Sequence, residues 1–125
     1  MILGVGVDII DVERIQAALE RPRTGERFRA RVFTDGEVAY CIRRRNAAES
    51  FAARFAAKEA MMKAFGGAYG WREIEVVRGT GAPTLQLHGR AQERAMALGL
   101  QRIHLSLSHT ATLAIAYVVA EGGDS

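Results

Sequence analysis

The sequence predicts a mixed α+β domain in which an antiparallel sheet of about five strands wraps against one long central helix. Residues 46–67 carry apolar side chains at intervals of roughly three to four, which indicates a helix with a packed face. Residues 1–10 are apolar and mostly β-branched, and residues 103–108 and 113–120 form a second strand-rich region. The 125 residues suit one domain spanning positions 1–125, since a chain of this length buries a single core.

The composition is typical of a soluble globular protein, with 49% hydrophobic and 25% charged residues. No apolar run approaches the roughly 20 residues that cross a bilayer, and the apolar N-terminus lacks a basic leader. Cys41 is the only cysteine, so an intrachain disulfide is impossible. These features predict a cytoplasmic protein that does not enter a membrane.

Positive charge is concentrated in the first half of the chain. The formal net charge of +3 is modest. All of the basic residues before the central helix are arginines, namely Arg14, Arg21, Arg23, Arg27, Arg29, Arg31, Arg43, Arg44 and Arg45. This half is expected to attract an acidic partner, which could be a nucleic acid, a phosphorylated cofactor or an acidic protein.

The first strand, residues 1–10, is expected to be buried, and Gly4 and Gly6 allow another backbone to approach it closely. Asp8 is the exception in this apolar stretch. Because an unpaired buried carboxylate is costly, Asp8 must be paired, hydrogen-bonded or bound to a metal. Capping the following helix is a weaker explanation, since Asp11 is better placed for that role.

Three short helices are expected next, over residues 11–19, 26–32 and 36–43. Pro22 and Gly25 separate the first two. Thr34 with Glu37 three positions later has the spacing of a capping box, which predicts the start of the third helix. The arginine run 43–45 then forms a loop before the central helix.

The central helix has recognisable ends. Asn46 and Glu49 have the spacing of a second capping box. Gly66 and Gly67 suit the left-handed residue that ends a helix. Many of the intervening positions are alanine, which favours helix and lets neighbouring backbones approach.

The charged residues of this helix form two pairs at i, i+4 spacing, Arg54 with Lys58 and Glu59 with Lys63. One carboxylate among three cations is a plausible seat for a metal-bound polyphosphate. An ordinary solvated helix face explains the same pattern, and the helix alone favours that reading.

The second half is expected to alternate strands with one helix, with strands at 71–78, 84–88, 103–108 and 113–120 and a helix at 90–98. The glycine-rich segment 79–83 provides a turn between the first two strands, and residues 109–112 provide one between the last two. Residues 121–125 are expected to be a frayed tail.

The usual catalytic signatures are missing from the sequence. Cys41 fits a buried small hydrophobe, and His88, His104 and His109 lack the spacing of zinc ligands. No phosphate-cradling GxxxxGK[ST] loop is present. What remains is a pair of isolated carboxylates, Asp8 and Glu59.

These two acids accompany the basic side chains Arg54, Lys58, Lys63 and His109. One or two carboxylates completed by phosphates and water are the usual ligands of Mg²⁺. The implied chemistry is attack on a phosphate ester or anhydride, with a metal and cations stabilising the charge that develops.

Three motifs resemble the holo-acyl-carrier-protein synthases, the small trimeric class of 4′-phosphopantetheinyl transferases: GVGVDIIDVERI, FAARFAAKEAMMKAFG and IHLSLSHTATLAIAYVVAE. The stretches FTDGEVAYC and GAPTLQLHG also fit, so the resemblance covers nearly the whole chain. It implies the fold of that family and Mg²⁺-dependent transfer of 4′-phosphopantetheine from coenzyme A to a serine hydroxyl of apo acyl carrier protein. The products are the modified carrier and adenosine 3′,5′-bisphosphate, in fatty-acid biosynthesis.

The resemblance also implies roles for individual residues. Asp8 and Glu59 match the metal pair, with Mn²⁺ as an alternative ion. Lys63 matches a lysine that contacts the phosphates, and Glu59, a metal-bound water or Lys63 accepts the serine proton. Arg54 matches a residue near the 3′-phosphate of coenzyme A.

Further residues match the nucleotide pocket and the carrier surface of the family. His109, Thr110 and the loop 81–83, including Pro83, line the nucleotide pocket. Basic residues that face the acidic helix of the carrier are Arg14, Arg21 and Arg23. The family forms homotrimers with sites between neighbouring subunits.

Some positions depart from the family pattern. Ala53 and Phe55 stand where glycine and tryptophan are frequent, and Thr24 stands where another basic residue is common. Residues 111–113 are less polar than the usual turn after the histidine.

Two other functions remain to be weighed. A basic nucleic-acid-binding module fits the arginine-rich half, but Trp71 and Tyr117 are the only ring residues in the expected strands, so no nucleic acid is expected. A noncatalytic trimeric scaffold would leave Asp8 unexplained.

Overall fold

The computed structural model describes residues 1–123. The elements follow in the order β1 (Ile2–Asp11), α1 (Val12–Glu20), α2 (Gly25–Val32), α3 (Asp35–Ile42), α4 (Ala47–Phe65), the 3₁₀ turn η1 (Trp71–Glu73), β2 (Ile74–Val77), β3 (Thr84–Leu87), α5 (Gly89–Leu98), β4 (Leu100–His109) and β5 (Leu113–Gly122). The predicted mixed α+β class with antiparallel strands around one long helix is confirmed.

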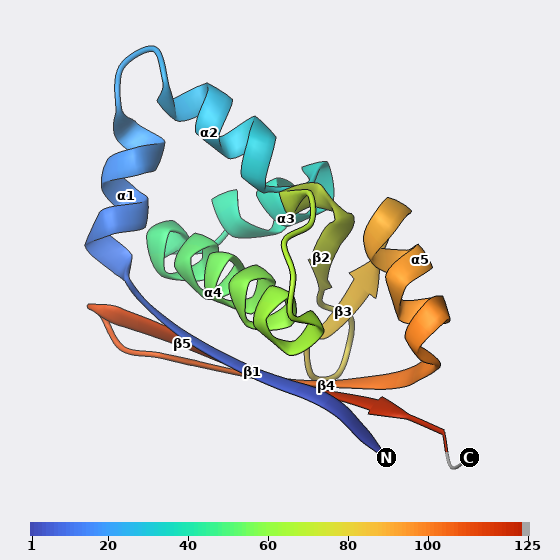
Figure 1. Cartoon of the computed structure of the whole chain (residues 1–125). Helices are drawn as coiled ribbons and strands as arrows, with labels where there is room; N and C mark the ends of the chain where they lie inside the picture. Colours follow the sequence, from blue (N-terminus) through green and yellow to red (C-terminus); the bar gives the residue numbers. More distant parts are fainter. Residues whose placement is uncertain (124–125) are drawn as a thin grey trace.

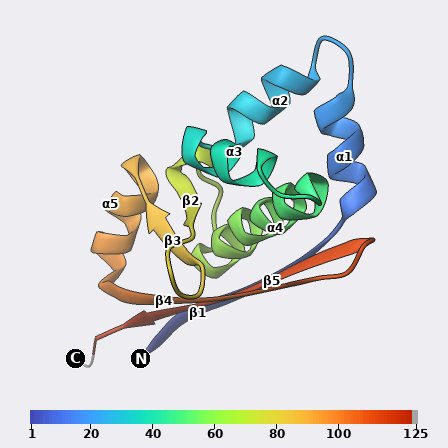
Figure 2. The same ribbon diagram turned by 180° about the vertical axis from the view of Figure 1, so that it is seen from behind.

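The strands form two sheets rather than the single sheet that was predicted. The larger has the order β1-β5-β4 with antiparallel pairing, and the smaller is the β2-β3 hairpin. In both views the larger sheet lies against one side of α4, while α1, α2 and α3 lie on the other side (Figures 1 and 2). The hairpin lies beside α4 with α5, and its four-residue strands do not join the larger sheet.

Helix α4 lies unusually close to β1. A Cβ added at Gly6 would clash with the carbonyl oxygen of Ala60, and one added at Gly4 would clash with that of Ala64. Glycine on the strand and alanine on the helix therefore allow the two backbones to touch. Asp8 shares the α4-facing side of the strand with these glycines, because alternate residues of a strand face the same way.

Only the C-terminal end of α4 has the cap that the sequence predicted. Gly66 has φ 74° and donates its N–H to the carbonyls of Met62 and Lys63, as predicted for the C-terminal cap. The Asn46–Glu49 capping box is wrong for the described structure, because Asn46 has φ −107° and ψ 66° and its side chain makes no capping bond. The Thr34–Glu37 box at the start of α3 is confirmed.

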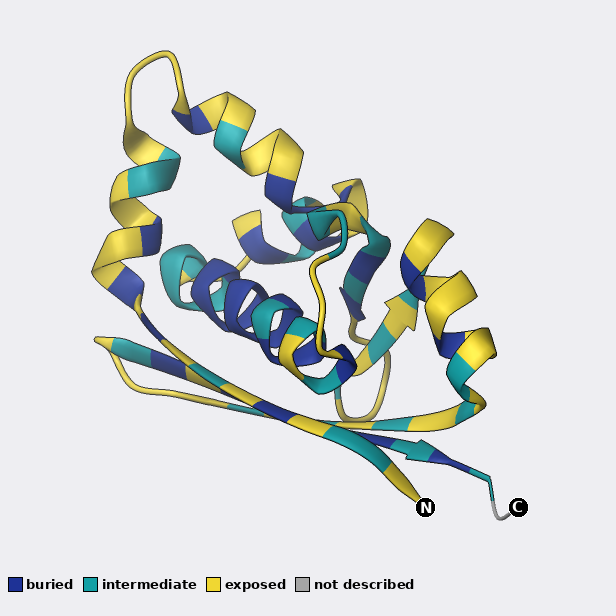
Figure 3. Ribbon diagram, viewed as in Figure 1, coloured by how far each residue is buried: buried dark blue, intermediate teal, exposed yellow. Residues whose placement is uncertain are grey.

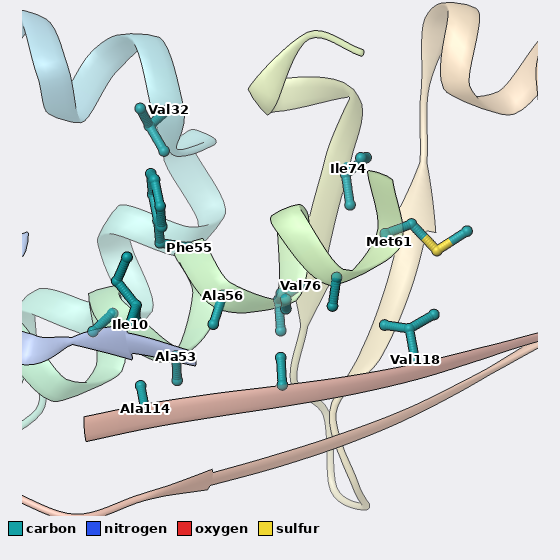
Figure 4. Close-up of a cluster of buried hydrophobic side chains, with 14 of the residues drawn as sticks. Ile10, Val32, Ala53, Phe55, Ala56, Met61, Ile74, Val76, Ala114 and Val118 are labelled. Atoms are coloured by element: carbon teal, nitrogen blue, oxygen red, sulfur yellow. The ribbon is translucent and has the colours of Figure 1, made fainter. Parts of the chain in front are cut away.

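Most residues of α4 are buried, and the colours of the ribbon in Figure 3 show buried positions along most of its length. The side facing the larger sheet contacts small β5 residues such as Ala114 and Ala116. The opposite side contacts an aromatic cluster in which Phe55 stacks on Trp71 with 4.9 Å between ring centroids. Figure 4 shows part of this core, with Ile10, Val32, Ala53, Phe55, Ala56, Met61, Ile74, Val76, Ala114 and Val118 labelled.

The chain ends differ from the prediction of a frayed tail. Strand β5 continues through Glu121 and Gly122, because Glu121 pairs with β1 and β4 and the Met1 ammonium donates to the Gly122 carbonyl at 2.9 Å. The remainder of the predicted tail, 124–125, lies outside the described residues. Residues 71–73, expected to begin a strand, instead form η1.

The face of the larger sheet that points away from α4 is apolar and exposed. On β1, Val5, Val7 and Ile9 are each more than half exposed, and they pair across to Val119, Tyr117 and Ile115 on β5. The prediction that β1 is buried is therefore wrong for this face of the isolated chain. Within residues 1–123, no helix combines the length and hydrophobicity needed to cross a membrane.

Candidate active site

Asp8 and Lys63 meet where β1 passes the C-terminal half of α4. The Lys63 Nζ donates to Asp8 Oδ1 and to the carbonyl oxygen of Val7, each at 3.0 Å. The Asp8 side chain is only 12% exposed, and its second oxygen, Oδ2, is buried without a hydrogen-bond partner among the described residues. A buried carboxylate oxygen of this kind needs a proton donor or a cation.

Glu59 lies one helical turn before Lys63 and close enough to Asp8 for the two charges to interact. Burial raises the pKa of Glu59, and the negative charge of Asp8 raises it further, while Lys63 and Arg14 oppose the shift. The fold thus brings together three residues that the sequence analysis placed in one site, Asp8, Glu59 and Lys63.

The two carboxylates have the chemistry of a partial cation site. Their mutual repulsion and the unpartnered Asp8 Oδ2 would both be relieved by a divalent cation. Residues 1–123 contain no cluster of three or more acidic, histidine or cysteine ligands. A cation held here would take its remaining ligands from phosphate and water, which is the habit of Mg²⁺.

A pocket opens beside Glu59 and Lys63. Its remaining lining is mostly apolar and small: Met62, Gly66, Gly67, Ala68 and Trp71. The sequence analysis did not assign Met62 or Trp71 to the site. The sequence pattern placed Trp71 at the start of a strand, and it gave no indication that the Trp71 ring would stack on Phe55 and form a wall of this pocket.

Arg54 is buried rather than solvated, with only 4% of its surface exposed. Its guanidinium lies 4.2 Å from the centre of the Tyr40 ring, and Nη1 donates to the Ser50 carbonyl at 3.2 Å. The Nε atom is buried and has no partner within the described part of the chain. Arg54 therefore packs against Tyr40 of α3, beside the first half of α4.

A second, basic pocket lies at that end of α4. It is lined by Arg43, Arg44, Arg45, Asn46, Glu49, Ser50 and His109. The His109 ring, half exposed, has Nδ1 4.0 Å from Glu49 Oε1. Glu49, predicted to cap α4, instead belongs to this pocket and was missed as a site residue.

Two other predicted nucleotide residues lie in turns. Thr110 Oγ1 accepts hydrogen bonds from the N–H groups of Thr112 and Leu113, so it stabilises the β4–β5 turn beside His109. Pro83 lies in the turn between β2 and β3 and lines neither of these two pockets.

The predicted partner residues Arg14, Arg21 and Arg23 are all exposed, on α1 and the turn that follows it. Arg23 has φ 70°, a left-handed conformation uncommon for a residue with a side chain. A shallow pocket between α1 and α2 is lined by Ala18, Arg21, Thr24, Arg27, Phe28 and Arg31. It adds two cations and one aromatic ring that the sequence analysis did not assign.

Lys58 does not join the cations of the candidate site. Its Nζ is fully buried and lies 2.8 Å from Glu37 Oε1. Both the proposed polyphosphate contact and the solvated-face alternative are therefore wrong for this residue, since α4 turns Lys58 towards α3 and β2.

The two clusters are well separated within one chain. Glu49 and Lys63 are fourteen residues apart on α4. At a rise of about 1.5 Å per residue, their Cα atoms are roughly 21 Å apart along the helix axis. The cluster of Asp8, Glu59 and Lys63 and the basic pocket are therefore separate sites on one chain.

Comparison with known proteins identifies the family. The profile described as "4'-phosphopantetheinyl transferase superfamily" matches residues 4–118. A holo-[acyl-carrier-protein] synthase of Anaeromyxobacter sp. (strain K) is 50% identical over 98% of both chains.

Solved structures agree. A holo-(acyl-carrier-protein) synthase from Bacillus anthracis in complex with CoA (3',5'-ADP) has TM-score 0.80 and 32% identity, covering 98% of this chain and 99% of that one. The Helicobacter pylori holo-[acyl-carrier-protein] synthase in complex with coenzyme A has TM-score 0.80 and 29% identity, covering 94% and 99%. The chain therefore belongs to the holo-[acyl-carrier-protein] synthases, within the 4′-phosphopantetheinyl transferase superfamily.

Proposed function

We propose that the protein transfers the 4′-phosphopantetheine group of coenzyme A to a serine hydroxyl of apo acyl carrier protein and releases adenosine 3′,5′-bisphosphate. The observation that carries the proposal is the cluster of Asp8, Glu59 and Lys63, two carboxylates and one ammonium, in a member of this family. The relatives are named for this reaction, and two similar structures contain coenzyme A or its nucleotide product. We assign the reaction to the cytoplasm and to fatty-acid biosynthesis.

Asp8 and Glu59 would hold the divalent cation, Mg²⁺ or Mn²⁺. When bound, the cation supplies Lewis-acid polarisation of the diphosphate and offsets its charge. Asp8 offers Oδ2, the oxygen without a partner, while Oδ1 keeps Lys63 in place. Lys63 thereby presents its ammonium to the phosphates next to the metal pair.

Glu59 is the residue to which we assign the serine proton. Its carboxylate lines the pocket beside Lys63, so it is placed to accept the proton directly or through a water on the bound cation. Lys63 already donates to Asp8 and to the Val7 carbonyl, which fits a charged ammonium that stabilises negative charge. In the transfer, the serine oxygen forms a bond to the pantetheine-bearing phosphorus and the bond to the leaving nucleotide phosphate breaks.

The basic pocket suits the 3′-phosphate of coenzyme A. Arg54 and Arg44 both lie over the Tyr40 ring, and His109 lines the pocket from the end of β4, with Thr110 next to it in the β4–β5 turn. The loop that carries Pro83 completes the nucleotide site in this proposal. A single ribose joins the 3′-phosphate to the diphosphate, yet about 21 Å of helix axis separates the cluster of Asp8, Glu59 and Lys63 from the basic pocket in one chain. We therefore propose that each active site combines two half-sites from neighbouring subunits. The acidic half-site is the cluster of Asp8, Glu59 and Lys63, and the basic half-site is the basic pocket of the adjacent subunit.

The exposed apolar face of the larger sheet is the surface that we assign to subunit contact. Val5, Val7 and Ile9 would be costly to leave in water beside Ile115 and Tyr117. Burying this face between copies, three in the proposed homotrimer, removes that cost and brings unlike half-sites together.

The surface of α1 and α2 suits the acidic helix of the carrier protein. Arg14, Arg21 and Arg23 supply exposed cations there, and the groove beside Arg21 offers the apolar contact of Phe28. Arginine forks pair with carboxylates through two hydrogen bonds, so this face is well matched to an acidic partner.

Mass spectrometry of the carrier tests the proposal. The protein, coenzyme A, Mg²⁺ and apo carrier should yield a carrier heavier by one phosphopantetheine, and a chelator should stop the reaction. Replacing Asp8 by alanine should lower the rate at least about 100-fold, because the cation and Lys63 lose their shared partner. Asp11→Ala is the matched control, since Asp11 is exposed and its side chain makes no capping bond among residues 1–123. Wild-type activity in the Asp8 variant would contradict the metal role.

A further inference from the structure

The ammonium of Lys58 is the most deeply buried charge next to the proposed site. Its Nζ contacts Glu37 Oε1 at 2.8 Å, the Trp71 carbonyl at 2.9 Å and the Ile74 carbonyl at 2.5 Å. An ammonium has three N–H donors, so these acceptors satisfy all of them. Burial lowers the pKa of Lys58, and the Glu37 carboxylate opposes that shift.

Glu37 completes a network that joins three elements. Its Oε1 also accepts from the Thr34 N–H at 2.9 Å, and its Oε2 accepts from the Val76 N–H at 2.8 Å. The ion pair therefore connects the start of α3, the middle of α4 and strand β2. Both side chains are fully buried, so removing one partner would leave the other charge uncompensated.

The carbonyls bound by Lys58 belong to the segment that forms one wall of the pocket beside Glu59 and Lys63. Trp71 lines that pocket, and its ring stacks on Phe55. Neither Trp71 nor Ile74 has another side-chain partner for its carbonyl among residues 1–123. Lys58 is therefore the side chain of α4 that holds the backbone of this wall, beside the contact between the Phe55 and Trp71 rings.

The sequence has a lysine at this point, although nearly all of its other lysine or arginine positions are arginine. The chain has 17 lysines and arginines, and Lys58 and Lys63 are its only lysines. A compact ammonium fits three acceptors in a closed site, whereas the planar guanidinium with five donors would leave several unsatisfied.

We infer that Lys58 is a positioning residue for the transfer reaction: through the carbonyls of Trp71 and Ile74 it fixes the wall of the pocket against Glu59 and Lys63. The inference rests on the proposed function, because it assigns this pocket to the reacting groups. Lys58 itself lines neither the pocket beside Glu59 nor the basic pocket. Its effect reaches the reaction through the backbone of residues 71–74.

The test uses a pair of substitutions that removes both charges. Lys58→Met alone should lower the melting temperature, because it leaves the buried Glu37 carboxylate without a positive partner. Glu37→Gln combined with Lys58→Met should recover part of that loss, because no uncompensated charge remains, although the glutamine has only one acceptor oxygen for the Thr34 and Val76 N–H groups. The two carbonyls still lack their ammonium in this variant. In this double variant, kcat should fall at least about tenfold while KM for coenzyme A stays within about threefold, since small misplacements near a reacting centre cost this much or more.

Fluorescence provides a readout that does not depend on activity. Trp71 is the only tryptophan, so quenching by acrylamide reports on this wall alone. Quenching should increase in the double variant. Arg72→Ala is the matched control, because Arg72 lies in the same segment but makes only exposed contacts with Ala30 and Asp35. It should leave kcat and quenching unchanged.

The outcomes are distinct. A folded double variant with wild-type kcat, or with wild-type quenching, overturns the positioning role. If the double variant does not fold, Trp71→Ala tests the same wall with the ion pair intact, and wild-type kcat in that variant overturns the inference. Absence of transfer by the wild-type protein overturns the proposed function and this inference together, whereas loss of transfer in the double variant alone supports the inference.

Discussion

At the scale of single residues, Asp8 and Glu59 carry like charges close together, and a bound cation would offset their repulsion. Asp8 uses one oxygen for Lys63 and leaves the other buried without a partner in the described structure. Glu59 has a raised pKa because of burial and the Asp8 charge. The same features that suit Mg²⁺ therefore cost stability when no metal is bound.

Glu59 makes the stability cost of the metal-free site measurable. Its pKa in the folded protein lies above the ordinary value of 4.5. Between these two pKa values, the folded protein therefore binds more protons than the unfolded chain. Stability of the metal-free protein should fall over that interval. Glu59→Gln should remove this dependence and raise the melting temperature of the metal-free protein at pH 7.

Mg²⁺ should stabilise the wild type at pH 7 and have little effect on the Glu59→Gln variant. Equal stabilisation of both proteins by Mg²⁺ would contradict the role of Glu59.

Cys41 gives a second prediction at this scale. Burial raises the pKa of its thiol to about 11, so the reactive thiolate is scarce near neutral pH. The native protein should react very slowly with a thiol reagent such as dithionitrobenzoate at pH 8, and one equivalent should react in denaturant. Rapid reaction of the native protein would show that the thiol is accessible.

At the scale of elements, β1 and α4 depend on each other because small residues let their backbones meet. A side chain at Gly6 has no room beside the Ala60 carbonyl. That carbonyl belongs to a helix buried on nearly all sides, so it cannot move aside cheaply.

Gly6→Ala should therefore destabilise the protein by about 1–3 kcal/mol, in the range measured for overpacked cores. Chemical denaturation measures the loss as a lower midpoint at an unchanged slope. Gly79→Ala is the control, because a Cβ at Gly79 meets nothing within 4 Å. A Gly6 variant as stable as the control would mean that the strand can shift away from α4.

The helices and strands also show which features of the fold the sequence could predict and which it could not. Periodicity and capping residues were enough to predict α4, α3 and the antiparallel strands, because those signals are local. The direction of Lys58 and the failure of the Asn46 cap could not be predicted, since spacing gives the side of a helix but not what packs there. The roles of Trp71 and Glu37 at the site could not be predicted for the same reason, because both depend on contacts between distant segments.

At the scale of the whole molecule, the isolated chain has two features that suit neighbours of its own kind. One face of its larger sheet is apolar and exposed. Its acidic half-site and its basic half-site lie near opposite ends of α4. A symmetric assembly that buries the apolar face would bring the acidic half-site of one chain to the basic half-site of another. Mixing inactive variants distinguishes this arrangement from a site contained in one chain.

Asp8→Ala disables the acidic half-site, and Arg45→Ala with His109→Ala disables the basic pocket. Each variant should be nearly inactive alone. In subunits co-assembled at equal amounts, a site between chains is intact when an undamaged acidic half meets an undamaged basic half, so activity should recover to about a quarter of the wild type. The control mixes Asp8→Ala with Glu59→Gln, which damage the same half and should restore nothing. If the first mixture also stays inactive while mass measurements show mixed assemblies, then both half-sites must act within one chain and the proposed arrangement is wrong.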